Sequence, residues 1–320
     1  MQEVECEQVT EGFVGNIAQF LRRKIMGDNF SGVHWMLATP FFDNENLDLK
    51  SMSALATKAE EFGCTGIVAL GVTGEVAKLT DNERTQISET VISSAKNIPI
   101  TLGTSGGSSF TVINRSIEAQ KLGAAAVMVS APPMLKPNDD ALLTFYEKLG
   151  NSIDIPIVVQ DYPETTGVHM SLSFIENLVE RVPSALYLKL EDPPTPNKIS
   201  SIRQRIGDRM EIFGGLGGVY LLDELARGSA GAMTGFAYPE ILISVCELMN
   251  NSSRDEAEAI FYKYLPLILF EGQSGIGISI RKAALHLRGF ISSPKVRFPG
   301  ANIDPNTQSE LESLITKLNL

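Results

Sequence analysis

Between residues 33 and 250, short apolar runs alternate with longer segments whose apolar residues recur every three or four positions. Short apolar runs bounded by turn residues are typical of buried strands, and the wider spacing is typical of helices. The pattern predicts eight strands, at residues 33–39, 66–70, 98–102, 125–129, 155–160, 184–192, 210–213 and 230–234. It predicts a helix after each strand, at about 47–62, 81–96, 110–122, 139–151, 171–182, 196–206, 218–227 and 239–250.

Eight strand–helix units in series predict an α/β protein that forms a closed (β/α)8 TIM barrel, because helical crossovers connect parallel strands. The rival is an open, doubly wound sheet, which normally has fewer strands and a GxGxxG turn after its first strand. The first strand here is closed by Thr39-Pro40 instead. We expect the barrel over residues 31–250 and a C-terminal helical bundle packed on it over residues 251–320, with helices at 254–270, 276–289 and 307–318.

Residues 1–30 lie outside the repeat and are predicted to form a helical N-terminal extension that docks on the barrel. An alternative is that translation naturally begins at Met26. The segment lacks the apolar region of a signal peptide and is acidic at its start, which favours a cytoplasmic location. Its helical pattern rests on Phe13, Ile17, Phe20, Leu21 and Ile25.

The composition and net charge of the chain limit the classes of partner that we expect it to bind. The chain of 320 residues is 43% hydrophobic and 20% charged, which is enough for a large core. Its 27 basic and 38 acidic residues give a net charge of −11. An acidic surface is a poor partner for nucleic acid or an anionic membrane, so we expect neither. No apolar run reaches 18 residues, so we expect no membrane-spanning segment.

The cysteines and histidines do not predict a metal site or a disulfide. The three cysteines lie far apart and have no C-x-x-C spacing, which argues against both. The three histidines are equally scattered. We therefore expect no metal, and a reducing compartment. These residues are Cys6, Cys64, Cys246, His34, His169 and His286.

The predicted strand at 184–192 carries a lysine inside an apolar run. Alternation along a strand places three leucines on one face and an amine followed by a carboxylate on the other. Burial in an apolar pocket disfavours the ammonium form of a lysine, and the neutral amine attacks carbonyl carbons to form an imine. The alternative to a reactive amine is an ordinary ion pair between Lys189 and Glu191. The two faces are Leu186, Leu188 and Leu190 against Ala185, Tyr187, Lys189 and Glu191.

The predicted barrel places Lys189 at the carboxyl end of its strand. Chemistry in this fold occurs at the carboxyl ends of the strands, and Lys189 is the single lysine among the residues that close them. The second strand is closed by Gly71-Val72-Thr73-Gly74-Glu75, a turn whose backbone N–H groups and Thr73 hydroxyl suit a carboxylate or phosphate. A purely structural turn is the alternative. The GK[ST] ending of a phosphate-binding P-loop is missing.

Together these motifs resemble the dihydrodipicolinate synthase/N-acetylneuraminate lyase superfamily. The resemblance covers roughly residues 32–295. It is carried by Thr39-Pro40, the Gly71–Glu75 turn with Leu79-Thr80 and Glu83-Arg84 after it, Pro133 to Pro137, Pro163 to Gly167, Lys189 and Gly231.

The resemblance implies that Lys189 forms a Schiff base with pyruvate or a related 2-oxo acid, which permits aldol cleavage, condensation or loss of water. It implies that Thr73 and the neighbouring amides of Gly71, Val72 and Gly74 hold the carboxylate, and that Met233 contacts the substrate through its backbone. It further implies no cofactor beyond the covalent imine, and a homo-oligomer, either a dimer or a tetramer.

The sequence departs from the family pattern at its proton relay. Gln160 stands at the position of the strand-five tyrosine, and Val72 at that of the first turn threonine. Met134 stands at the position of the relay tyrosine from the neighbouring subunit, and Thr165 at that of the arginine that binds the second substrate of the synthases. A glutamine does not titrate as a general acid. Authentic 4-hydroxy-tetrahydrodipicolinate synthase activity is therefore kept only as an alternative.

Another group must move protons if this is an enzyme. Glu191, two residues after Lys189, is the first candidate because a carboxylate in a partly apolar pocket works near neutrality. Asp161, Tyr162 and Tyr187 are further candidates, and Gln160 is expected to orient water or a substrate oxygen. We expect a class I lyase or aldolase. The remaining alternatives are a non-catalytic carboxylate-binding sensor or scaffold, and a phosphate-binding isomerase-type barrel.

Overall fold

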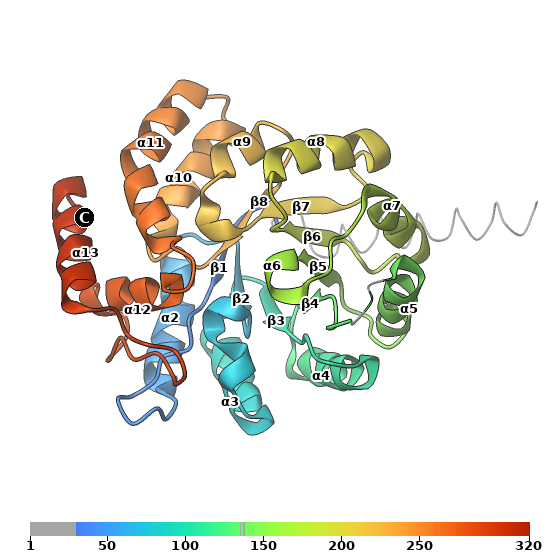
Figure 1. The fold of residues 1–320 in the computed structure, drawn as a ribbon, viewed down its shortest axis with the longest axis horizontal. Coiled ribbons are helices and arrows are strands. Elements are labelled where there is room, and N and C mark those ends of the chain that lie inside the picture. The colour runs from blue at the N-terminus through green and yellow to red at the C-terminus, as the bar shows by residue number, and fades with distance from the viewer. Residues whose placement is uncertain (1–29, 135, 137) are drawn as a thin grey trace, which may run out of the picture.

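The computed structural model describes residues 30–134, 136 and 138–320. The predicted N-terminal extension therefore lies outside the described residues, apart from Phe30. The chain from there onward forms a barrel of strands ringed by helices, with further helices on one side (Figure 1).

Eight parallel strands pair in chain order, and β1 pairs with β8 to close the barrel. The predicted (β/α)8 barrel is therefore confirmed. In β6 the Cα of Lys189 lies opposite Gln160 of β5 on one side and Phe213 of β7 on the other. The strands are β1 Gly32–Met36, β2 Gly66–Ala69, β3 Ile100–Gly103, β4 Ala126–Ser130, β5 Ile157–Asp161, β6 Tyr187–Leu190, β7 Glu211–Gly214 and β8 Gly231–Thr234.

A helix follows each strand, close to the predicted ranges. Short apolar-faced helices after each strand cover the outside of the barrel, as parallel strands require. The helices of the barrel are α2 Leu49–Glu61, α3 Asp81–Ser94, α4 Ser109–Leu122, α5 Asp139–Gly150, α7 Leu172–Arg181, α8 Thr195–Ile206, α9 Leu221–Leu225 and α10 Pro239–Asn250. The 3-10 turns are η1 Val72–Gly74, η2 Val76–Lys78 and η3 Leu216–Gly218.

Two local differences from the prediction have clear causes. The helix predicted at 218–227 shortens to α9, and its start moves to Leu221 because Gly218 takes a positive φ of 86°, which a helix does not allow. A short helix that was not predicted, α6 Pro163–Thr166, follows β5. It begins at a proline and ends at Gly167, whose φ of 68° suits a left-handed cap.

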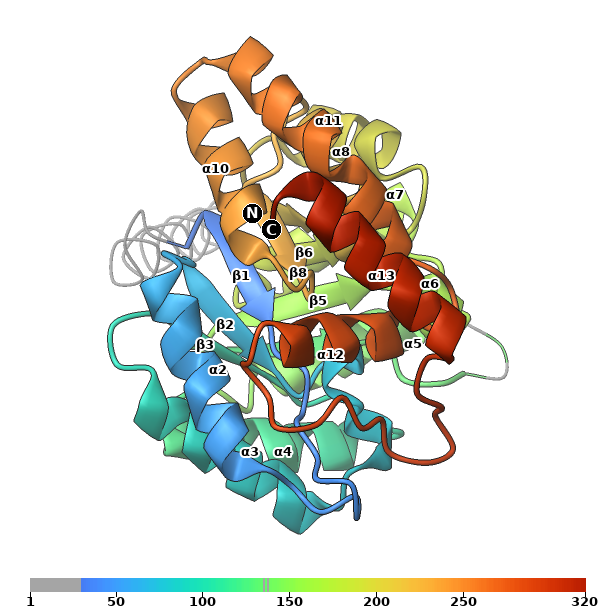
Figure 2. The same cartoon turned by 90° about the vertical axis from the view of Figure 1, so that its left-hand side faces the viewer.

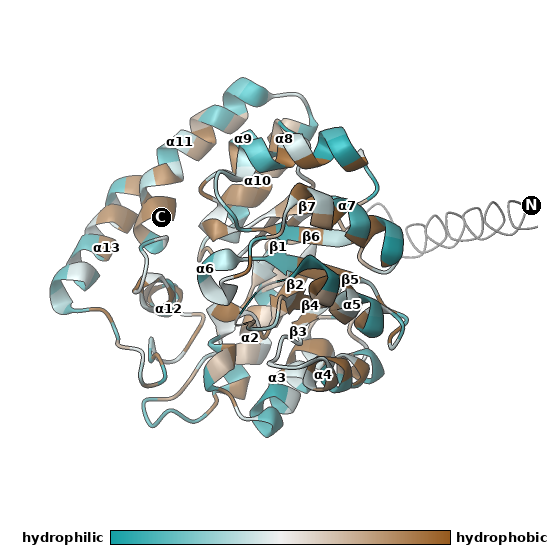
Figure 3. Cartoon of the chain, turned by 45° about the vertical axis from the view of Figure 1, so that its right-hand side comes forward, coloured by the Kyte–Doolittle hydropathy of each residue, from teal (hydrophilic) through white to brown (hydrophobic). Residues whose placement is uncertain are grey.

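The core has an inner and an outer part. Inside the barrel, residues such as Met128, Tyr187 and Phe213 pack together, whereas Leu188 and Leu190 face the surrounding helices. Helices show apolar colour toward the barrel and polar colour toward solvent (Figure 3). The predicted alternation of the lysine strand holds from Tyr187 onward but is wrong for Leu186, which joins the inner cluster. The backbone still turns there, with the N–H of Leu186 bonded to the carbonyl of Ser184.

The C-terminal extension consists of α11 Arg254–Glu271, α12 Gly277–Leu287 and α13 Pro305–Leu318. Helix α11 runs beside α10, and α13 lies across α11 and α12 on the flank of the barrel (Figure 2). Among the described residues, no helix is long and apolar enough to cross a membrane.

Candidate active site

A cavity of about 430 Å³ opens at the carboxyl ends of the strands. Its floor comes from strand ends and strand-end turns, with Thr73, Gln160, Lys189 and Met233 among the lining residues. Its outer wall comes from the C-terminal extension, from Ile268 of α11 to Arg281 of α12. The predicted nucleophile therefore lies in a pocket of the size that binds small ligands.

Three predicted catalytic residues meet in this cavity. Lys189 is 2% exposed, Gln160 4% and Glu191 6%. The Lys189 Nζ lies 2.9 Å from Glu191 Oε2, and the same oxygen accepts a 2.7 Å hydrogen bond from Gln160 Nε2. One carboxylate oxygen thus holds the amine and is itself held by an amide. This arrangement keeps a proton acceptor beside a nucleophile, as imine chemistry requires.

The backbone after β6 and β7 fixes the direction of Glu191. Its own N–H donates to the Asp161 carbonyl at 2.8 Å, which extends the β5–β6 ladder by one residue. The N–H of Leu216 lies 3.4 Å from Glu191 Oε1. A Cβ on Gly215 would come within 2.4 Å of the Glu191 Cγ, so the glycine leaves the space that the carboxylate occupies. The second oxygen of Glu191 is therefore also restrained.

The Thr73 turn forms another part of the cavity floor. Val72 and Thr73 line the cavity, and the Thr39 hydroxyl donates to the Gly74 carbonyl at 2.7 Å. The N–H groups of Gly74 and Glu75 bond inside the turn, to the carbonyls of Gly71 and Val72. The first N–H groups of such a turn lack an internal partner, so the amides of Val72 and Thr73 are the ones available to an anion.

Four predicted binding residues have other positions. Gly71 and Gly74 belong to the turn but do not line the cavity. A Cβ on Gly71 would lie 2.5 Å from the Met36 Cε, so the packing there favours a glycine. Thr165 is exposed on α6, and its hydroxyl donates to the Tyr162 carbonyl at 3.1 Å. Met134 packs against the core of its own barrel. Neither Thr165 nor Met134 lines the cavity of the single chain. The family resemblance had implied both roles, and the one implied for Met134 concerns the site of a neighbouring subunit, so it stays a prediction.

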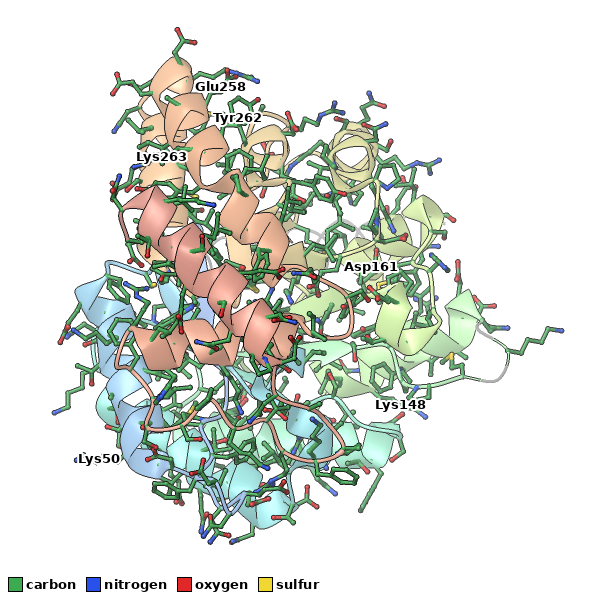
Figure 4. All side chains as sticks on the ribbon, turned by 60° about the vertical axis from the view of Figure 1, so that its left-hand side comes forward. Lys50, Lys148, Asp161, Glu258, Tyr262 and Lys263 are labelled. Atoms are coloured by element: carbon green, nitrogen blue, oxygen red, sulfur yellow. The ribbon has the colours of Figure 1, made fainter. Side chains whose placement is uncertain are left out.

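The other candidates for proton transfer differ in their position relative to the cavity. Asp161 (labelled in Figure 4) forms a 2.6 Å ion pair with Lys198 of α8, away from the cavity. Tyr187 lies deeper in the barrel and stacks on Phe30 at 4.0 Å. Tyr162 lines the cavity, and burial, together with the nearby charge of Glu191, raises its pKa to about 12. Glu191 is thus the candidate that contacts Lys189.

Two charged cavity residues of the C-terminal helices were missed by the sequence reasoning. Glu271 ends α11 and Arg281 lies on α12, and both line the cavity. Burial raises the pKa of Glu271 to about 7, against the opposing effect of Arg281. A signal was available for Glu271, because it is an acid that directly follows the apolar run from Leu265 to Phe270. Such a charge at the end of a buried helix is unusual.

The described residues do not bring three or more histidine, cysteine, aspartate or glutamate side chains together in a way that would hold a metal ion. Cys64 and Cys246 are both buried and free. Burial raises the pKa of each thiol to about 12, which disfavours the reactive thiolate. The cavity lining itself offers an amine, carboxylates, amides, hydroxyls and a guanidinium.

Comparison with known proteins places these features in context. The chain matches the Dihydrodipicolinate synthetase family over residues 29–318. It is 30% identical to an L-2-keto-3-deoxyarabonate dehydratase of Azospirillum brasilense, over 90% of this chain and 94% of the relative. It is 26% identical to a 4-hydroxy-tetrahydrodipicolinate synthase of Methanothrix thermoacetophila, over 91% of this chain and 97% of the relative.

The chain is also similar to a solved structure of a synthase. The crystal structure of a dihydrodipicolinate synthase from Rhodopseudomonas palustris superposes with a TM-score of 0.86 and 34% identity, and covers 90% of this chain and 98% of that one. The shared region includes the barrel and the C-terminal helices.

Proposed function

Because this chain belongs to the dihydrodipicolinate synthetase family of lyases, we propose that it acts on a 2-oxo acid through a Schiff base on Lys189 and eliminates water from it. The observation that carries the proposal is the contact of Lys189 Nζ with Glu191 Oε2 at 2.9 Å inside the cavity. The named activity of the dehydratase relative supports elimination of water over the other reactions open to an imine.

The first step is attack of the Lys189 amine on the ketone carbon C2, with loss of one water to give an iminium. The substrate carboxylate is held by the Thr73 hydroxyl and the amides of Val72 and Thr73. The positive iminium withdraws electrons from C3 and makes its hydrogens acidic. C3 is only two bonds from Nζ, so the adjacent Glu191 oxygen is within reach of its proton.

The second step is elimination. Glu191 takes a proton from C3, and the resulting enamine expels a hydroxyl from C4. The proton held by Glu191 joins the leaving hydroxyl, so a neutral water departs. A further water then hydrolyses the iminium, which returns Lys189 and releases a product one water smaller than the substrate. Gln160 acts as a positioning residue, because its amide donates to the oxygen that moves the proton.

Synthase activity is the weaker candidate. The synthase relatives support it, at 25–29% identity. The non-titrating Gln160 in the cavity and the exposed Thr165 oppose it. A non-catalytic sensor is the other alternative. It predicts 2-oxo acid binding that Lys189→Ala leaves unchanged, without turnover, in calorimetry.

Borohydride trapping tests the proposal. Reduction of the protein in the presence of pyruvate should leave a stable adduct on the peptide that contains Lys189, detected by mass spectrometry. Lys189→Arg keeps the charge but should give no adduct, which makes it the matched control. Absence of an adduct on Lys189 with any 2-oxo acid would contradict the proposal.

The role of Glu191 is tested in the same assay. Glu191→Gln should still be trapped with pyruvate, but turnover of 2-keto-3-deoxyarabonate should fall by about 10²- to 10⁴-fold, the usual contribution of a general acid–base group. Unchanged turnover would remove Glu191 from the mechanism. We also expect a homo-oligomer, and light scattering after size-exclusion chromatography will measure its mass. The expected location is the cytoplasm.

A further inference from the structure

The part of the cavity wall that comes from α11 and α12 contains two charged side chains with unused hydrogen-bonding capacity. Glu271 is fully buried, and its Oε1 has no hydrogen-bond partner among the described residues. The same is true of Arg281 Nε. The two groups lie close together, with 3.6 Å between Arg281 Nε and Glu271 Oε2, which is longer than a hydrogen bond.

The fold holds both groups in place. Glu271 Oε2 accepts the N–H of Ala237 at 3.0 Å, which ties the end of α11 to the segment after β8. The Arg281 guanidinium lies over Gly217, where an added Cβ would be 3.2 Å from Nη2. Buried polar groups are nearly always paired, so an unpaired acceptor beside an unpaired donor in a cavity wall indicates a place for a ligand.

A hydroxyl group fits this pair. A hydroxyl accepts one hydrogen bond and donates another, so it satisfies the Arg281 donor and the Glu271 acceptor together. The raised pKa of Glu271, about 7, lets the same oxygen donate or accept near neutral pH. A pyruvate-sized acid that fills the Lys189 and Thr73 end would leave the pair unsatisfied.

A second carboxylate fits poorly. Glu164, Glu191 and Glu271 line the cavity against the cations Lys189 and Arg281. In its ionised form Glu271, the carboxylate paired with the Arg281 guanidinium, would repel an incoming anion at close range and low dielectric. The pair is therefore built for a neutral polar group.

We infer that Glu271 and Arg281 form the specificity site for a hydroxyl at the far end of the substrate, so that the substrate is a hydroxylated monocarboxylic 2-oxo acid and not a dicarboxylic one. This inference rests on the proposed Lys189 chemistry for the orientation of the substrate. It assigns a substrate-selecting role to the C-terminal extension, which supplies both residues.

Half-saturation in borohydride trapping tests the inference with three probes: pyruvate, 2-keto-3-deoxyarabonate and the dicarboxylate 2-oxoglutarate. The unmodified protein should bind the hydroxylated acid at least tenfold more tightly than the other two. Glu271→Gln and Arg281→Met should each weaken trapping of the hydroxylated acid by about 10- to 100-fold and leave pyruvate within twofold. Arg281→Lys should recover part of the loss.

A matched control lies on the same helix. Arg254 and Glu258 form an exposed 2.7 Å ion pair at the outer end of α11 (Glu258 is labelled in Figure 4). Arg254→Met and Glu258→Gln should leave all three probes unchanged. Trapping of pyruvate without preference for the hydroxylated acid, or a preference that survives both cavity variants, would overturn the inference alone. Failure to trap any probe would instead defeat the proposed Lys189 chemistry, and the inference with it.

Discussion

Two buried lysine–glutamate pairs lie on either side of the Thr73 turn and have different surroundings. The Lys189–Glu191 pair, at 2.9 Å, faces the cavity. The Lys282–Glu75 pair, at 2.6 Å, lies behind the turn and has no exposed side-chain surface. The same two functional groups thus occur once beside open space and once in a closed interior.

The difference lies in the other partners of the two amines, because Glu191 and Glu75 each accept from three groups. Lys282 Nζ also donates to the Lys295 carbonyl at 2.7 Å and lies 4.3 Å from the centre of the Phe41 ring. The second oxygen of Glu75 accepts from Lys78 at 2.8 Å and from the N–H of Arg297 at 3.1 Å. A fully paired amine has no bond left for a substrate. Burial alone therefore does not identify a lysine that is open to a substrate, and Lys189 differs from Lys282 in that it lines the cavity.

The carboxylates near each pair follow the same division. Behind the turn, hydrogen bonds from Arg297 lower the pKa of Glu83 to about 2. Near the active site, burial raises the pKa of Glu224 to about 7, and its Oε2 has no hydrogen-bond partner among the described residues. The carboxylate behind the turn is thus held in its ionised form, whereas burial disfavours the ionised form of Glu224.

The largest expected effect is on activity. Lys189→Ala should lower turnover of 2-keto-3-deoxyarabonate by about 10⁴-fold or more, because no imine forms. Its midpoint of thermal unfolding should stay close to that of the unmodified protein, since the amine contacts a cavity. Turnover and calorimetric melting are the two measurements. A large drop in melting temperature would break the contrast with Lys282.

The next effect is on stability. Lys282→Met should lower the free energy of unfolding by about 3–5 kcal/mol, because it leaves the buried Glu75 charge without its closest partner. Chemical denaturation measures this loss. Lys282→Met with Glu75→Gln should recover part of it, and pyruvate trapping on Lys189 should persist in whatever fraction stays folded. A neutral effect of the single change would show that the pair is not a structural tie.

The smallest effect is on pH dependence. The pKa of Glu224 is about 7 in the folded protein and 4.5 when unfolded. Its contribution to stability is therefore fully present below pH 4.5 and is lost as the pH rises through about 7. Glu224→Gln should flatten this decline by about 2 kcal/mol between pH 5 and 8. Urea denaturation across that range measures the slope, to which Glu271 also contributes with the same sign.

The sequence predicted much of the scaffold because its signals are local. The strand alternation around Lys189 and the glycines of the Thr73 turn act within a few residues, and the sequence predicted the alternation from Tyr187 onward and the presence of the turn. The pairing of Lys282 with Glu75 spans 207 positions, and the approach of Glu271 and Arg281 to the strand ends depends on how α11 and α12 pack. No local pattern encodes such distances. Thr165 and Met134 were assigned from the family resemblance and not from a local pattern, and the inter-subunit position implied for Met134 stays a prediction.

The placement of the cavity wall also has a consequence for synthesis of the protein. Glu271, Arg281 and Lys282, which secures the Thr73 turn from behind, all follow Lys189 by more than 80 positions. A chain still emerging from the ribosome therefore contains Lys189 before it contains this part of the cavity wall or that anchor. The cavity is complete only after helices α11 and α12 have been synthesised, well after the strand that carries the proposed nucleophile.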